Sequence, residues 1–276
     1  MKFSFSSNAF RKYSLSEAAD AMSDAGYTGI EIMCDTPHAY PPDLSAADVS
    51  SIKKELTRKG LTIANLNAFM LCAINNFHHP SWIEKDKHYR ELRIRHTLNC
   101  IDLAAKLGVR TISTEPGGPV NGMPRETALE IFMEGLSRVV PYAIEKGVVV
   151  LIEPEPGLLI ETSDQFVSFI DQFGHKGMGL NFDVGHFYCV GEDPAAKIKE
   201  LKNYIFHFHL EDIPESREHR HILLGEGGID IPGVLNAIEA IGYQDFVTVE
   251  LYPYQDSAPE TARKARNYLR KVCGYG

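Results

Sequence analysis

Four residues that could bind a metal ion each end or follow an apolar segment in the second half of the chain. They are Glu153, Asp183, His209 and Glu250. Three carboxylates and one imidazole suit a hard or borderline divalent cation such as Mn²⁺, Mg²⁺ or Co²⁺. Zn²⁺ is an alternative, although structural zinc usually takes Cys and His. Without a cation, carboxylates packed together would repel one another and raise each other's pKa.

Each of these residues also has an ordinary explanation. A carboxylate after an apolar strand is often a helix N-cap or a solvated loop residue. Glu153 lies beside Pro154 and Pro156, which oppose a helix start, so capping explains it poorly. Side-chain alternation makes His207 and His209 face the same way, so either could be the ligand. The coincidence of four such residues at consecutive strand ends favours one metal site.

The elements that must position these residues are eight β-rich runs, alternating with helical patterns along the chain. This rhythm predicts parallel strands with crossover helices. We therefore expect an α/β fold, a (β/α)8 TIM barrel, as a single domain over residues 1–276. An open doubly wound sheet is the alternative. The runs are Lys2–Ser6, Gly29–Met33, Leu61–Leu66, Val109–Ser113, Val148–Glu153, Met178–Asp183, Tyr204–His209 and Phe246–Glu250.

Helix boundaries are marked by caps and glycines. Ser14 and Glu17 have the spacing of a capping box at a helix start. Several helical patterns end at a glycine that precedes an apolar run, for example Gly26, Gly108 and Gly147. In a closed parallel barrel all strands end at one rim, where such barrels carry their active sites. The four candidate ligands should therefore converge there.

The overall composition narrows the class of partner. The net charge of -9 over 276 residues disfavours binding to nucleic acid or to an anionic membrane. The five scattered cysteines suit reduced thiols. The chain starts without the apolar run of a signal peptide, and no stretch approaches the ~20 apolar residues of a membrane span. We expect a soluble, cytoplasmic protein.

Four segments resemble the xylose isomerase-like barrel superfamily and, within it, the sugar phosphate isomerase/epimerase group. They are Leu151–Gly157, Asn181–His186, His207–Asp212 and Thr248–Leu251, and Leu224–Asp230 matches a Gly-x-Gly turn of that group. The resemblance spans essentially the whole barrel. In the similar ketose 3-epimerases, the metal ligands would correspond to the four residues above. Their acid/base pair would correspond to Glu153 and Glu250.

The resemblance also implies substrate contacts. It gives His186 a role against the substrate, and Glu155 resembles a carboxylate that supports the group's site. Where those epimerases carry an arginine, this chain has His221 with Arg220 beside it. From the residues alone, two further candidates for substrate binding end early strands. They are Glu31 on the second strand and Asn67 on the third.

A long insertion, Asn67–Lys85, follows the third strand. It could act as a lid carrying His78 and His79, with Phe69 and its neighbours as an apolar pocket wall. Trp82, the only tryptophan, could stack on a sugar face there, although packing is the commoner role.

The expected function is a divalent-metal isomerase or epimerase of a ketose or related polyhydroxy-carbonyl compound, acting through an enediolate. The alternative on the same scaffold is a metal-dependent dehydratase of the inosose or dehydroshikimate type. A remote alternative is an endonuclease-like phosphodiesterase. A further alternative is a non-catalytic barrel that binds a metal ion. We expect a small sugar-like substrate as partner, and the resemblance suggests a homodimer or homotetramer.

Overall fold

The computed structural model describes residues 1–174 and 176–274, and these form a closed barrel of eight parallel strands in chain order. The barrel closes where β1 pairs with β8, from Lys2 opposite Phe246 to Phe5 opposite Val249. The predicted barrel is therefore confirmed. Its strands are β1 (Lys2–Ser6), β2 (Gly29–Met33), β3 (Thr62–Asn67), β4 (Thr111–Thr114), β5 (Val149–Ile152), β6 (Met178–Asp183), β7 (Ile205–Leu210) and β8 (Phe246–Val249).

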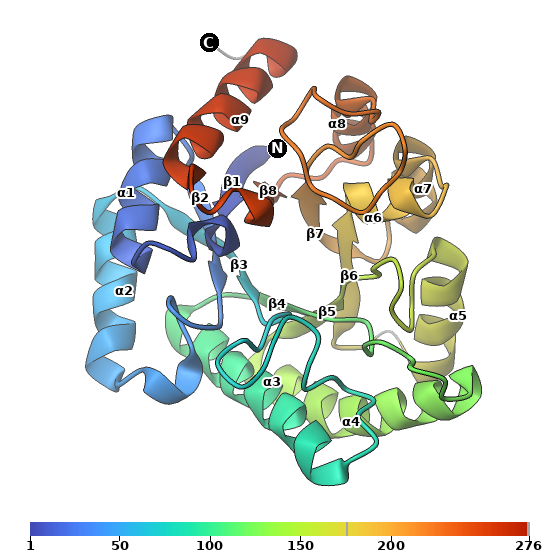
Figure 1. The fold of residues 1–276 in the computed structure, drawn as a ribbon. Helices are drawn as coiled ribbons and strands as arrows, with labels where there is room; N and C mark the ends of the chain where they lie inside the picture. The colour runs from blue at the N-terminus through green and yellow to red at the C-terminus, as the bar shows by residue number, and fades with distance from the viewer. Residues whose placement is uncertain (175, 275–276) are drawn as a thin grey trace.

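Helices surround the barrel on its outside (Figure 1). In chain order they are α1 (Leu15–Ala25), α2 (Ala46–Arg58), α3 (Lys87–Leu107), α4 (Arg125–Lys146), α5 (Ser163–Phe173), α6 (Val184–Cys189), α7 (Pro194–Leu201), α8 (Ile231–Ala240) and α9 (Ala258–Cys273). The short α6 was not predicted from the sequence. It begins directly at the end of β6 because the Asp183 carboxylate caps it, accepting a hydrogen bond from the His186 amide.

Local sequence explains where the helices begin and end. Ser14 and Glu17 form the expected capping box at the start of α1. Gly108 follows α3 with φ of 78°, a left-handed conformation that costs glycine no steric strain. The same helix end shortens the next strand. Val109 still donates its amide to the Ala104 carbonyl, so β4 starts at Thr111 and not at Val109 as predicted.

Apolar side chains from the strands and the inner faces of the helices form one continuous core. Among the described residues, no helix combines the length and apolar composition that crossing a bilayer requires.

The segment between β3 and α3 is tied to the barrel by buried charges. Asp35, which follows β2 closely, accepts hydrogen bonds from the Cys72 and Ala73 amides. Arg93 of α3 is 0% exposed and donates to the Phe69 carbonyl at 2.8 Å and the Pro80 carbonyl at 2.9 Å. Both ends of the expected lid are thus fixed to the barrel.

Candidate metal centre and active site

The four candidate metal ligands meet at the C-terminal rim of the barrel. All four are buried, and one ligand atom from each lies within 4.8 Å of the others. The parallel barrel produces this arrangement because its strands all end at the same rim. Glu153 follows β5, Asp183 ends β6, His209 lies near the end of β7 and Glu250 follows β8.

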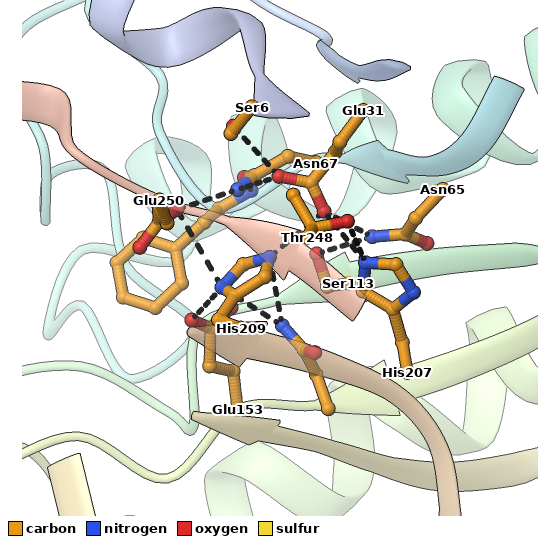
Figure 2. A network of polar contacts seen from close by, with 12 residues as sticks. Ser6, Glu31, Asn65, Asn67, Ser113, Glu153, His207, His209, Thr248 and Glu250 are labelled. Carbon is orange, nitrogen blue, oxygen red and sulfur yellow. Dashed lines mark hydrogen bonds and ion pairs between the residues drawn. The ribbon is translucent and has the colours of Figure 1, made fainter. Parts of the chain in front are cut away.

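The His209 ring lies close to both Glu153 and Glu250 (Figure 2). Its Nδ1 lies 2.8 Å from Glu153 Oε1, 3.5 Å from Glu250 Oε1 and 3.8 Å from Asp183 Oδ2. Within the described residues, Glu153 Oε2 and Asp183 Oδ2 are buried without a hydrogen-bond partner. Buried carboxylate oxygens without partners are costly, and a divalent cation would satisfy them. The donor set therefore fits a metal ion.

The pKa shifts within the cluster also favour a bound cation. Burial raises the pKa of Glu153, and it raises the pKa of Glu250 well above its usual range, although His209 opposes both shifts. Burial disfavours the charged form of His209, but Glu153, Glu250 and Glu31 outweigh it and raise the His209 pKa well above its usual range. The position between these groups therefore attracts positive charge.

Glu31 contacts the ring nitrogen of His209 that does not face Glu153, and it does not line the cavity. His209 donates from Nε2 to Glu31 Oε2 at 2.8 Å (Figure 2). Glu31 is 0% exposed and is not among the cavity-lining residues. The sequence predicts that Glu31 contacts the substrate, but the structure places Glu31 against His209, a candidate metal ligand. The β2–β3 register shifts between Ile30 and Glu31, so a regular strand pattern does not predict the direction of this side chain.

His207, the other histidine of β7, lies one layer deeper. Its Nε2 is 3.3 Å from Glu31 Oε2 and 2.8 Å from the Thr248 hydroxyl. The structure therefore brings His209, rather than His207, to the three carboxylates.

A cavity of about 420 Å³ opens above the metal ligands. Glu153 and Glu250 form part of its lining. Three of the predicted substrate-binding residues also line it, namely His186, Glu155 and Asn67. Burial raises the pKa of Glu155 well above its usual range, and the charge of Glu153 adds to that shift. The cavity thus gives a small molecule direct access to both proposed acid/base residues.

Arg220 and His221 have different positions from those expected. Arg220 is exposed and is not among the lining residues, which corrects its expected place beside the substrate. His221 is 1% exposed and lies behind the lining, with its Nδ1 donating to the Glu250 carbonyl at 2.9 Å. In this segment His219 and His221 lie inward with their rings 5.6 Å apart, whereas Arg220 between them is exposed.

His219 is a lining residue that the sequence analysis missed. Its ring lies 4.7 Å from that of His186, whose Nδ1 donates to the Pro154 carbonyl at 2.8 Å. Burial lowers the pKa of His186 well below its usual range and that of His221 to about 3. These rings are therefore neutral. With Nδ1–H engaged, the Nε2 of His186 and of His221 is a hydrogen-bond acceptor.

Asn8 and Tyr252 were also missed. Asn8 lies in the 3-10 helix η1 (Ser7–Phe10), directly after β1, and donates from Nδ2 to Glu250 Oε1 at 2.7 Å. Tyr252 begins the 3-10 helix η3 (Tyr252–Tyr254) after β8, and both residues line the cavity. The candidate metal ligands were identified as polar residues at or just past strand ends. The same criterion would also have identified Asn8.

The insertion forms one wall of the cavity, as expected. Phe69, Met70 and Phe77 contribute apolar surface, and His78 and His79 line it as well. Trp82 does not. It is 0% exposed, packs against Phe132 and donates from Nε1 to the Thr114 hydroxyl at 3.0 Å. Packing, rather than sugar stacking, is therefore the role that the structure gives to Trp82.

Two relatives of known name align over most of the chain. An inosose dehydratase of Geobacillus thermodenitrificans is 27% identical over 92% of this chain and 88% of the relative. An inosose isomerase of Bacillus velezensis is 26% identical over 90% of this chain and 88% of the relative.

Two solved structures share the fold over nearly their whole length. The crystal structure of the IOLI protein with a zinc atom has a TM-score of 0.79 and 20% identity, covering 99% of this chain and 98% of that one. The crystal structure of a D-tagatose 3-epimerase-like protein has a TM-score of 0.80 and 22% identity, covering 99% of each chain. Residues 19–272 match the sequence model of one family, and the chain thus belongs to the xylose isomerase-like TIM barrel family.

Proposed function

We propose that this chain is a divalent-metal enzyme that moves a proton next to the carbonyl of an uncharged polyhydroxy ketone, as an isomerase or epimerase. One observation carries the proposal. Three carboxylates and an imidazole from successive strand ends have ligand atoms within 4.8 Å of one another, and two of these residues, Glu153 and Glu250, line a cavity large enough for a sugar or cyclitol.

Glu153, Asp183, His209 and Glu250 would hold one metal ion. When bound, a divalent cation polarises a carbonyl and stabilises the negative charge that develops on its oxygen. Mn²⁺, Mg²⁺, Co²⁺ and Zn²⁺ all accept such a donor set, and the zinc atom of one structural neighbour supports a divalent ion.

Glu153 and Glu250 are the proposed acid/base pair. They come from strands on either side of β6 and β7, and both border the cavity. Burial raises the pKa of each carboxyl, which brings proton uptake and release closer to neutral pH. One glutamate would remove the proton next to the substrate carbonyl. The other would return a proton to the opposite face or to the neighbouring carbon of the enediolate.

The rest of the cavity suits an uncharged, hydroxyl-rich substrate. Among the described residues that line it there is no lysine or arginine. His186 presents an acceptor nitrogen that a substrate hydroxyl can reach, and Phe69 and Met70 offer an apolar face opposite polar groups. A phosphate group would find no cationic partner in this lining, and the overall charge of -9 also disfavours nucleic acid as substrate.

A dehydratase is the second candidate, because several relatives bear that name. Both reactions start with the same proton abstraction. They differ in the next step, since a dehydratase protonates a departing hydroxyl where an isomerase or epimerase protonates carbon. The same glutamate pair can serve either outcome.

The test is to incubate the metal-loaded protein with ketohexoses and inososes in D₂O. We expect deuterium uptake next to the carbonyl, seen by NMR, with a new ketose for isomerisation or epimerisation and enone absorbance for dehydration. E153Q and E250Q should each reduce exchange by at least about 100-fold. E115Q, which changes a buried glutamate outside the cavity lining, should retain it. If wild type showed no exchange or elimination with any substrate and metal, the proposal would be refuted in favour of a non-catalytic barrel that binds a metal ion.

A further inference from the structure

Glu31 reaches the metal site from a strand that is not a neighbour of the ligand strand. β2 pairs with β1 and β3, whereas His209 lies on β7, so their contact crosses the barrel interior. The distance from His209 Nε2 to Glu31 Oε2 is 2.8 Å, and both side chains are 0% exposed. Solvent and substrate therefore have no access to this contact.

Four donors hold the Glu31 carboxylate in one orientation (Figure 2). Its Oε1 accepts from the Ser6 hydroxyl at 2.8 Å and from Asn67 Nδ2 at 3.3 Å. Its Oε2 accepts from Asn65 Nδ2 at 2.9 Å and from His209 Nε2. An ionised carboxylate has about four acceptor positions, so these donors use its capacity. Glu31 is thereby engaged as an acceptor and is not a free metal ligand.

The contact decides which nitrogen of His209 can bind a metal. Because the Glu31 carboxylate accepts a hydrogen bond from Nε2, Nε2 keeps its proton, and a metal would bind His209 through Nδ1 in place of the contact between Nδ1 and Glu153. Nδ1 is the nitrogen that lies 2.8 Å from Glu153 Oε1 and 3.5 Å from Glu250 Oε1. A carboxylate behind a ligand imidazole also makes the ring a better electron donor.

We infer that Glu31 is a positioning residue that fixes His209 as an Nδ1 ligand and strengthens its bond to the metal. The inference rests on the proposed metal site. It extends to the second acid/base residue, since Asn67 Nδ2 lies 3.3 Å from Glu31 Oε1 and 3.4 Å from Glu250 Oε1. One buried carboxylate thus orients a metal ligand directly and Glu250 through Asn67.

The test measures metal affinity of the full chain rather than activity. Zn²⁺ and Mn²⁺ dissociation constants are determined by competition with a chromogenic chelator for wild type, E31Q and E31D. The matched control is E115Q, because Glu115 is also 0% exposed but contacts Arg93 and Trp82, not a metal ligand. Thermal denaturation in excess chelator checks that each variant is folded.

We expect E31Q to bind metal about 10- to 100-fold more weakly than wild type, because glutamine can accept the Nε2 hydrogen bond but carries no charge. E31D keeps the charge but holds it farther from His209, so its metal affinity should lie between those of wild type and E31Q. E115Q should match wild type. Co²⁺ absorption bands should shift in E31Q but not in E115Q.

Equal metal affinity of wild type and both Glu31 variants would overturn the inference while leaving the metal site intact. An equal loss in E115Q would also overturn it, because the effect would then follow from replacing any buried glutamate. Failure of wild type itself to bind either metal would instead refute the proposed function, and this inference with it.

Discussion

Glu115 offers a test of how the barrel accommodates a buried acid behind the cavity wall. It follows β4, is 0% exposed and lies 3.6 Å from Arg93 Nε. Its Oε1 accepts the Trp82 amide at 3.2 Å, but its Oε2 has no hydrogen-bond partner within the described residues. Burial raises the pKa of Glu115 to about 8, outweighing Arg93, which lowers it. At neutral pH the acid is then mostly protonated.

This shift predicts a specific pH dependence of stability. Because the pKa is raised on folding, the contribution of Glu115 is complete below the unfolded value near 4.5 and is lost as the pH rises towards about 8. Each pKa unit corresponds to about 1.4 kcal/mol, so the loss between roughly pH 5 and pH 8 is about 4 kcal/mol. E115Q keeps an acceptor for the Trp82 amide and carries no titrating group.

The assay is urea denaturation of wild type and E115Q at about pH 5, 6.5 and 8, with chelator present throughout. Other buried acids titrate in both proteins, so their contributions cancel in the difference between the two unfolding free energies. That difference should shift by about 4 kcal/mol in favour of E115Q as the pH rises. A difference that stays constant within about 0.5 kcal/mol would show that Glu115 is ionised in the folded protein, paired with Arg93, and would refute the reasoning.

Three further predictions follow from contacts around the cavity. R93M leaves the Ala68, Phe69 and Pro80 carbonyls without their buried donor, and urea denaturation at neutral pH should show a loss of about 3–5 kcal/mol. Zn²⁺ at about 1,000 times its dissociation constant should raise the unfolding free energy by about 4 kcal/mol, and chelator should reverse the shift in a thermal melt. N8A removes the 2.7 Å hydrogen bond that orients Glu250, so metal affinity and kcat for deuterium exchange should each fall about 10-fold.

The sequence was sufficient to predict the barrel and the convergence of the four candidate ligands, because both follow from strand ends. Strict alternation of strands and helices leaves few topologies, and a parallel barrel brings every strand end to one rim. Glu153 and Glu250 could therefore be placed near each other, although 97 positions separate them in the chain. The predicted start of β4 at Val109 was wrong because the end of α3 still uses that amide.

Side chains away from regular strand ends could not be placed in this way. The register shift beside Glu31 changes its direction, and strand periodicity carries no information about such a shift. His219 and Arg220 lie in the connection between β7 and α8, whose path depends on contacts such as the bridge between Asp212 and Ile222. A one-residue change of direction there decides that His219 faces the cavity and Arg220 faces solvent.

Residues at strand ends and residues in the connections would also have different roles in deciding whether the enzyme is an isomerase or a dehydratase. In the proposed mechanism, proton abstraction would depend on Glu153, Glu250 and the other candidate ligands, which the strands hold in place. The outcome would depend on whether a carbon or a hydroxyl of the substrate lies near the second glutamate. The side chains placed to set that orientation are His186, His219 and Phe69, which line the cavity and lie outside the strands. One set of strand-end ligands can therefore support both reactions, and substitutions in these connections, rather than in the ligands, should shift the ratio of the two products.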